Sequence, residues 1–134
     1  MSLKSKKKII FFSNSLWYFH NFKLDLINDL SKKYKLFLII PNHDSKLKFR
    51  KDIDIINLFI PIDNNLSMIE PLIILPKLLF HFKKIDPDLV INFTSKCNLY
   101  SSIICKYLNI KCINNITGLG SLFLKDKPSY WLIQ

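Results

Sequence analysis

Short apolar runs alternate along the chain with longer stretches in which apolar residues recur at helical spacing. A continuous run of about four to eight apolar residues is typical of a buried parallel strand, whereas helical spacing is typical of an amphipathic helix. The runs predict strands at Lys8–Ser13, Lys35–Ile40, Ile55–Ile60, Asp88–Phe93 and Lys111–Asn114. The spacing predicts helices over Asn21–Tyr34, Ser67–Lys84 and Leu99–Leu108, and the start of another at Pro128–Gln134.

Turn and cap residues separate these elements. Prolines end two of the strands, and residues 42–53 are polar and basic, as expected of a connecting loop. Ser67 and Glu70 have the spacing of a capping box, in which each side chain bonds a free backbone N–H at a helix start. Pro76 lies inside the same predicted helix, where a proline is expected to kink or break it.

Strands that alternate with helices indicate an α/β fold with a doubly wound, Rossmann-like parallel sheet. In such a sheet the ligand lies outside the carboxyl ends of the strands, where the strand order reverses. Two predicted strands open there into a polar loop, Thr94–Asn98, and a glycine-containing loop, Thr117–Gly120. We therefore expect function to lie on this edge. The length fits one domain over residues 1–134, and because the last predicted helix is cut short we expect a larger protein.

Composition supports a folded chain and narrows its chemistry. The 134 residues are 49% hydrophobic and 22% charged, and they contain neither an apolar window of spanning length nor a signal-peptide pattern. We therefore expect a cytoplasmic protein. The three cysteines do not form a C-x-x-C pair and the three histidines are scattered, so no metal site is predicted. The cysteines are expected to be buried free thiols.

The formal net charge of +10 has two interpretations. It attracts a nucleic acid, an anionic lipid or a phosphorylated small molecule, or it reflects a compositional bias toward lysine. Sequence signatures of RNA-binding domains are absent. Residues 68–82 are apolar almost all round, which fits either a core helix or a helix that contacts a membrane through Lys77, Lys83 and Lys84.

Three segments at the predicted ligand edge are candidate sites. The first is the loop at 13–21, which lacks a dinucleotide-binding glycine motif but offers a polar and aromatic platform; alternatively, its aromatic residues pack on the sheet. The second, Thr94–Lys96, precedes a helix start and either binds an anion or caps the helix, with Lys96 as a mobile cation. The third, Thr117–Gly120, allows close approach of a ligand to the backbone, although glycine turns are common. No catalytic residues can be identified.

Three stretches resemble the N-terminal domain of family-four-type glycosyltransferases of the GT-B fold, which build bacterial capsule, lipopolysaccharide O-antigen or N-linked glycans. They are KIIFFSNSLWYFHNFKLDLINDL (Lys8–Leu30), PDLVINFTSKCNLY (Pro87–Tyr100) and NNITGLGSLF (Asn114–Phe123). The last two match the family's patterns PD-apolar run-T-x-K-x-N-x-Y and N-x-x-TGLG-x-x-F. Many relatives have a glycine-rich first loop, whereas SNSLWYFHN has no glycine, so contact of this loop with donor phosphates is not implied.

The resemblance implies an acceptor-binding domain, the N-terminal half of a GT-B fold. The enzyme would transfer a hexosyl or N-acetylhexosaminyl unit, with retention, from a nucleotide sugar to a prenyl-diphosphate-linked or other glycan acceptor, without metal or cofactor. The C-terminal, donor-binding domain is absent here, so the chain alone is expected to be inactive. Together with the aromatic first loop, the resemblance gives the acceptor-side, cleft-lining residues Asn14, Ser15, Trp17, His20, Asn21, Thr94, Lys96, Asn98, Thr117, Gly118 and Gly120.

Partners follow from this interpretation. They are a nucleotide sugar, a lipid-linked glycan, an anionic membrane surface at the inner face of the cytoplasmic membrane, and a donor-binding domain that is missing or is a separate chain; nucleic acid is not expected. One alternative is a non-catalytic subunit that recruits the rest of a split transferase to the membrane. Another is a basic α/β module that binds nucleic acid.

Overall fold

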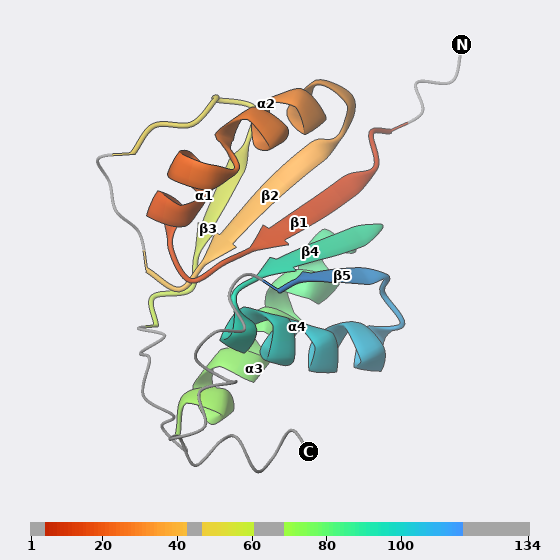
Figure 1. Ribbon diagram of the computed structural model, residues 1–134. Helices are drawn as coiled ribbons and strands as arrows, with labels where there is room; N and C mark the ends of the chain where they lie inside the picture. Colours follow the sequence, from red (N-terminus) through yellow and green to blue (C-terminus); the bar gives the residue numbers. More distant parts are fainter. Residues whose placement is uncertain (1–4, 43–46, 61–68, 117–134) are drawn as a thin grey trace.

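The chain folds into a parallel sheet with helices on both faces (Figure 1). The computed structural model describes residues 5–42, 47–60 and 69–116. The strands are β1 (Lys8–Phe12), β2 (Lys35–Ile40), β3 (Asp54–Asn57), β4 (Leu89–Phe93) and β5 (Cys112–Asn115). The helices of the described residues are α1 (Leu16–Phe22), α2 (Leu24–Lys33), α3 (Glu70–Ile85) and α4 (Ser95–Leu108).

The five strands pair in the order β3-β2-β1-β4-β5, all parallel. Strand β1 is central, because Ile9 stands opposite both Leu36 of β2 and Leu89 of β4. A strand enclosed by neighbours and covered on both faces has no polar side, which explains why β1 is the apolar run KIIFF. The predicted doubly wound, Rossmann-like α/β class is thereby confirmed.

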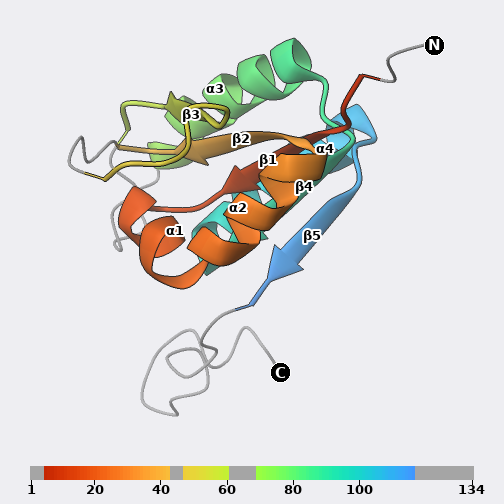
Figure 2. The same ribbon diagram turned by 90° about the horizontal axis from the view of Figure 1, so that it is seen from above.

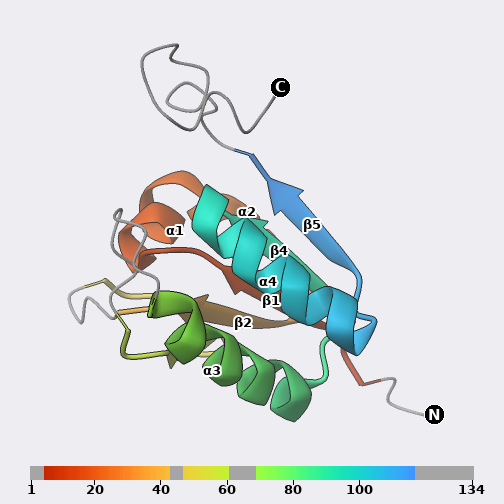
Figure 3. The same cartoon turned by 90° about the horizontal axis from the view of Figure 1, so that it is seen from below.

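Two helix layers cover the two faces of the sheet (Figures 2 and 3). Helices α1 and α2 cover one face, where Phe11 is completely buried. Helices α3 and α4 lie side by side over the other face, where Ile10 and Phe12 are completely buried. Successive residues of β1 therefore supply two separate cores, as the alternation of side chains along a strand requires.

The predicted aromatic loop after the first strand is largely helical, which corrects the sequence interpretation. Ser15 is the N-cap of α1, and its hydroxyl oxygen accepts a hydrogen bond of 3.2 Å from the Tyr18 backbone N–H. That bond satisfies one of the free donors of the first turn, so the helix begins at Leu16 rather than at Asn21. Lys23 then leaves helical geometry, with φ of −131°, so two short helices replace the single one predicted.

Helix α3 also differs from prediction at its start and at Pro76. It begins at Glu70, and the Glu70 carboxylate bonds residues of α4. Ser67, the other member of the predicted capping box, lies outside the described residues. The helix continues through Pro76 unbroken. Proline leaves the carbonyl of residue i−4 unbonded, and here that residue is Leu72, which is exposed, so water can reach the carbonyl.

Other boundaries move by a few residues. Helix α4 begins at Ser95 instead of Leu99, and β3 ends at Asn57 instead of Ile60. The chain still follows β2 after β3 ends, because Leu58 N–H bonds the Ile40 carbonyl at 2.9 Å. Strand β2 has the predicted bounds. The predicted helix start at residues 128–134 lies outside the described residues.

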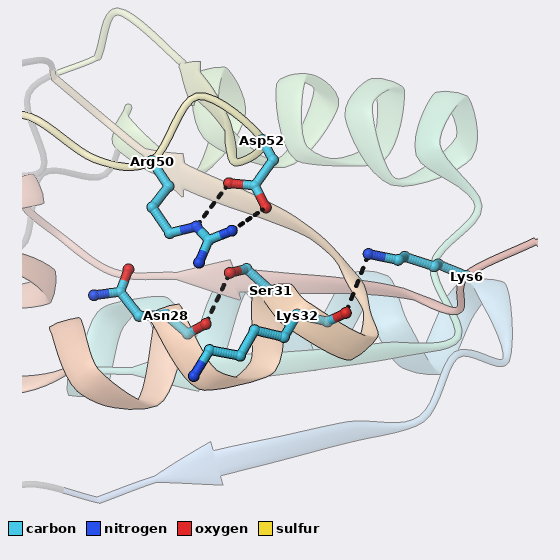
Figure 4. A network of polar contacts seen from close by, with 6 residues as sticks. All are labelled: Lys6, Asn28, Ser31, Lys32, Arg50 and Asp52. Atoms are coloured by element: carbon cyan, nitrogen blue, oxygen red, sulfur yellow. Dashed lines mark hydrogen bonds and ion pairs between the residues drawn. The ribbon is translucent and has the colours of Figure 1, made fainter.

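Polar contacts secure the end of α2 and the turn before β3 (Figure 4). The Lys6 ammonium donates to the Lys32 carbonyl at 3.2 Å, and the Ser31 hydroxyl donates to the Asn28 carbonyl at 2.9 Å. Arg50 binds both carboxylate oxygens of Asp52, at 3.0 and 3.1 Å. The first two contacts give hydrogen bonds to carbonyls near the end of α2, and the Arg50–Asp52 pair holds the turn before β3. We therefore assign them a structural role.

Candidate functional site

The strand order reverses at β1, which makes the carboxyl ends of β1 and β4 the topological switch point. Chain order runs from β1 outward to β2 and β3 on one side, and β4 and β5 follow on the other side. After β1 the chain passes to α1 on one face, and after β4 it passes to α4 on the opposite face (Figures 2 and 3). Loops that diverge in this way form the ligand position of open α/β sheets. The switch point is therefore the candidate site.

The β1–α1 loop contributes Ser13, Asn14 and Ser15 to this site. Ser13 is completely buried; its N–H donates to the Ile39 carbonyl at 3.2 Å, and its hydroxyl donates to Asn14 Oδ1 at 3.4 Å. Ser15 is half-buried and caps α1. Asn14 is exposed. The loop thus offers a ligand the Asn14 amide, held on a rigid strand end.

The aromatic residues of α1 divide between core and surface. Phe19 is completely buried and packs against Phe93 of β4, with ring centroids 5.7 Å apart. Trp17 is 56% exposed and keeps an edge contact with Phe22 at 5.6 Å. Of the two alternatives for this segment, sheet packing accounts for Phe19, whereas Trp17 retains the surface that a platform would need.

His20 and Asn21 make local contacts on α1. The His20 ring stands edge-on to Phe49, in the segment before β3, at 6.0 Å. The Asn21 amide donates to the Trp17 carbonyl within the same helix, at 2.9 Å. Neither contact brings the side chain to the β4 loop. Their predicted role in lining a cleft stays a prediction.

Thr94 has an unusual backbone at the end of β4. Its φ is 75° and its ψ is 148°, a region that only glycine enters freely. Thr94 is the N-cap residue of α4 but makes no side-chain cap bond. Its hydroxyl is buried beside the Cys97 thiol and makes no bond to the backbone N–H groups of the first turn. Thr94 therefore occupies the N-cap position without the side-chain bond of a usual N-cap, and anion binding by this segment stays a prediction.

Lys96 is bound to Glu70, which corrects the expectation of a mobile cation. Its ammonium lies 2.9 Å from Glu70 Oε2, and the side chains are 19% and 5% exposed. The Tyr100 hydroxyl donates to Glu70 Oε1 at 3.0 Å. Burial, and secondly this bond, raise the pKa of Tyr100 to about 12. The carboxylate therefore fastens the start of α3 to the first turns of α4.

Asparagine side chains form a polar seam between β4, β5 and α4. The Asn92 amide donates to Asn114 Oδ1 across the strands at 2.8 Å, and the Asn114 amide donates to the Ser102 hydroxyl of α4 at 2.8 Å. The Asn98 amide donates to the Asn115 carbonyl at 3.2 Å. The seam fixes the carboxyl end of β5 beside the head of α4.

Several of these residues were missed from the sequence. Glu70 was assigned to a helix cap, although a lone acid before a long apolar helix is also a candidate for a buried ion pair. Asn92 stands inside an apolar strand, and Asn114 occupies the paired position of β5. Polar residues at matching places in two neighbouring strands, the buried β4 and the exposed edge strand β5, were the signal that could have predicted this seam.

The two buried thiols of α4 are not nucleophilic at neutral pH. Burial raises the pKa of Cys97 to about 12 and that of Cys105 to about 11, so both remain protonated at neutral pH. Cys112 is exposed, so the expectation of three buried thiols is corrected for this residue. Among residues 5–42, 47–60 and 69–116, no cluster of three or more His, Cys, Asp or Glu side chains could hold a metal ion.

An open hollow of about 560 Å³ lies at the opposite, amino edge of the sheet. Its lining mixes charges of both signs, including Lys7, Lys111, Asp86 and Asp88. Helix dipoles at this edge point their negative ends outward, and the carboxylates of Asp86 and Asp88 add to that negative field. We therefore keep the switch point as the candidate site.

Comparisons with known proteins place the fold. No protein-family model matches the chain, and no curated protein matches it. The crystal structure of a UDP-N-acetylglucosamine 2-epimerase is similar, with a TM-score of 0.61 and 20% identity over 87% of this chain. The C-terminal domain of a hydrogenase from Pyrococcus furiosus matches with a TM-score of 0.49 and 11% identity, covering 83% of this chain and 94% of that domain, and we build nothing on it.

The likeness to the epimerase concerns the fold. The chain spans 33% of that enzyme's length. The chain is therefore a parallel α/β domain whose fold resembles part of that enzyme. Of the predicted site residues, Asn14, Ser15 and Thr94 flank the switch point, and Lys96 and Asn98 lie in the first turn of α4. Thr117, Gly118 and Gly120 lie outside the described residues.

Proposed function

We propose that the chain is the acceptor-binding domain of a glycosyltransferase. The enzyme transfers a sugar, with retention, from a nucleotide sugar to a prenyl-diphosphate-linked or other glycan acceptor. The observation that supports this most is the strained Thr94 at the switch point. Backbone strain of this kind persists where the surroundings impose it, and it clusters at ligand sites.

The chemistry of the switch point suits a sugar. Asn14 offers both an amide donor and a carbonyl acceptor on the rigid end of β1, and sugar hydroxyls need partners of both kinds. Trp17, exposed on the adjoining helix, supplies an apolar surface on which a sugar ring can lie. The similarity of fold to an epimerase of UDP-N-acetylglucosamine supports a carbohydrate enzyme in general.

Binding of an acceptor by this chain tests the proposal. The ligand is N-acetylglucosamine linked by a diphosphate to a short prenyl chain, titrated calorimetrically below its micelle concentration. Asn14→Ala should weaken binding about fivefold to tenfold, the effect of one hydrogen bond. The matched control is Asn109→Gly at the opposite edge, where the backbone is left-handed, with φ of 56°, and tolerates glycine.

Three outcomes decide the matter. Binding that Asn14→Ala weakens and Asn109→Gly does not supports the proposal. Absence of binding, or equal losses in both variants, contradicts it.

A second candidate function, a domain of a nucleotide-sugar epimerase, is favoured by the structural likeness alone. It is supported instead if the chain binds UDP-N-acetylglucosamine tightly and ignores the lipid-linked sugar.

A further inference from the structure

The outer face of α3 and α4 exposes an unusual amount of apolar surface. Each helix buries one side against the sheet, with Ile74, Leu78 and Phe82 completely buried on α3. The opposite side remains uncovered in the described residues. Its large exposed apolar side chains are Leu72 (74%), Ile73 (45%), Phe80 (60%), Leu99 (58%), Ile103 (48%) and Tyr107 (71%). Of the two alternatives for residues 68–82, core packing accounts for one side of α3, and membrane contact by the other side stays a prediction.

These side chains form one surface, which we call the α3/α4 face. The two helices lie side by side on the same layer (Figures 1 and 3). Leu99, Ile103 and Tyr107 are four residues apart and so form a row along α4. The Lys83 ammonium of α3 lies 6.0 Å from the centre of the Tyr107 ring of α4, which joins the two rows.

The α3/α4 face is positively charged. The only acidic residue in α3 and α4, Glu70, is buried and bound to Lys96 and Tyr100. Lys83, Lys84 and Lys106 are exposed in the last turns of the two helices. Even with Asp86 at the end of α3 counted, these two helices carry more lysines than acids, so this face attracts an anionic partner.

Exposed apolar rows combined with lysines favour a bilayer over other anionic partners. A nucleic acid would engage the lysines but leave the leucine and isoleucine side chains in water. A second copy of the chain would bring two positive faces together. A bilayer interface accepts apolar side chains at the acyl boundary and places lysines at the level of the phosphates. We propose that the α3/α4 face binds the surface of an anionic membrane.

This placement brings the membrane near the candidate site, and in that respect it rests on the proposed function. Both helices begin at the carboxyl edge of the sheet, at Glu70 and Ser95, beside the switch point. A glycan anchored in the bilayer by a prenyl chain would then emerge next to Asn14 and Thr94. An open hollow of about 470 Å³ flanks α3 and is lined in part by Phe59, Pro76 and Phe80, so apolar surface continues beyond the helix.

Vesicle co-sedimentation of the whole chain tests the membrane surface. The probes are vesicles of phosphatidylcholine with and without the anionic lipid phosphatidylglycerol, in low salt, where lysines near the surface are attracted to anionic headgroups. The triple variant Lys83→Gln/Lys84→Gln/Lys106→Gln should bind anionic vesicles roughly a hundredfold more weakly, at about fivefold per lysine. Phe80→Ser/Ile103→Ser should bind at least about tenfold more weakly, because it removes inserted apolar surface.

Matched controls replace exposed residues on other surfaces. Lys33→Gln/Lys48→Gln/Lys51→Gln removes the same charge, and Phe22→Ser/Leu26→Ser removes comparable apolar surface from α1 and α2. Both should bind anionic vesicles within about twofold of the original chain, since single surface changes of this kind alter the fold little. Equal losses in test and control variants would overturn the assignment of the face.

Two further outcomes are decisive. No binding to anionic vesicles in low salt overturns the proposal. A dimer in light scattering that Phe80→Ser/Ile103→Ser dissociates overturns it in favour of self-association. Because the vesicles contain no glycolipid and the acceptor titration contains no vesicles, failure of either proposal is distinguishable from failure of the other.

Discussion

At the scale of single residues, Thr94 links backbone geometry to the candidate site. The chain must turn from the end of β4 into α4 within one residue, and the buried strand leaves no room to spread the turn. A β-branched residue pays for that geometry with strain that glycine would avoid. The neighbouring ion pair between Glu70 and Lys96 and the buried side chain of Phe93 hold both ends of the turn in place.

Replacing Thr94 should reveal this strain. Thr94→Gly relieves the left-handed backbone, whereas Thr94→Ala removes the same hydroxyl and keeps the strain. We expect the glycine variant to be about 1 kcal/mol more stable than the alanine variant, measured as the free energy of unfolding in urea. An alanine variant of equal or greater stability would contradict the strained backbone.

Tyr100 and the buried thiols should make the fold sensitive to alkali. The pKa of Tyr100 is raised from 10.0 to about 12 in the folded chain, and that of Cys97 from 9.0 to about 12. Between about pH 9 and pH 12 the unfolded chain loses these protons before the folded chain does, so it binds fewer protons than the folded chain. The free energy of unfolding therefore stays level below about pH 9 and falls as the pH rises toward 12.

Tyr100→Phe separates the tyrosine from the thiols. At neutral pH it should lower the free energy of unfolding by about 2 kcal/mol, because the Glu70 carboxylate loses a donor. It should also flatten the decline above pH 10. The control is Tyr107→Phe on the exposed side of α4, which should change stability by less than about 0.5 kcal/mol. Identical alkaline profiles for the two variants would refute the assignment.

At the scale of elements, α3 shows how burial decides where proline is tolerated. Pro76 lies on the exposed side of the helix, and Leu78 on the buried side anchors the following turn to the sheet. Packing of that buried side keeps the helix continuous despite the missing backbone bond. Periodicity alone predicts the helix but cannot tell whether packing will overcome its proline.

The cost of this proline is measurable. Pro76→Ala restores the backbone bond to the Leu72 carbonyl and should raise the free energy of unfolding by about 2 kcal/mol. Pro71→Ala is the matched control, because Pro71 lies in the first turn, where no bond is lost, and it should change stability by less than about 0.5 kcal/mol. If urea titrations give equal values for both variants, the helix is not strained at Pro76.

Element boundaries show what a linear pattern can predict. The continuous run KLFLII predicts β2 correctly, because after Lys35 at its open end the strand is enclosed by neighbours and has only apolar residues. The segment 14–20 follows the first strand, and the sequence predicts it as an aromatic connecting loop before a helix that begins at Asn21. A single serine cap and the burial of Phe19 were enough to make it helical. The cap joins residues three positions apart, whereas Phe19 is buried by packing against the distant Phe93, a contact that local spacing does not contain.

At the scale of the whole molecule, lysines gather at the amino edge of the sheet. Lys6, Lys7, Lys8, Lys35 and Lys111 precede or begin strands, and Lys32, Lys33, Lys83, Lys84 and Lys106 lie in the last turns of helices. Cations at the carboxyl ends of helices are favoured by the helix dipole. Part of the positive charge is thus explained by the architecture, which composition alone could not separate from attraction to a partner.

The parallel α/β class could be predicted, the ligand edge stays a prediction, and the contacts within the candidate site could not be predicted. Alternating elements imply parallel strands, and polar loops after two strands imply their edge. That Lys96 would bind Glu70 depends on the packing of α3 against α4, which joins residues 26 positions apart. The predicted residues Asn14 and Thr94 do reach the same edge of the sheet, through the pairing of β1 with β4. Their binding role stays a prediction.

The central place of β1 also has a consequence for synthesis on the ribosome. Strand β1 leaves the ribosome first, but one of its two neighbours, β4, begins about 80 residues later, as the bond from Lys8 to Asp88 shows. During that interval β2 can pair with one edge of β1, but the edge that will pair with β4 has no partner. Unpaired strand edges promote aggregation. Slow translation between β3 and β4 would prolong this exposure, so the yield of folded protein should depend on how quickly this part of the message is read.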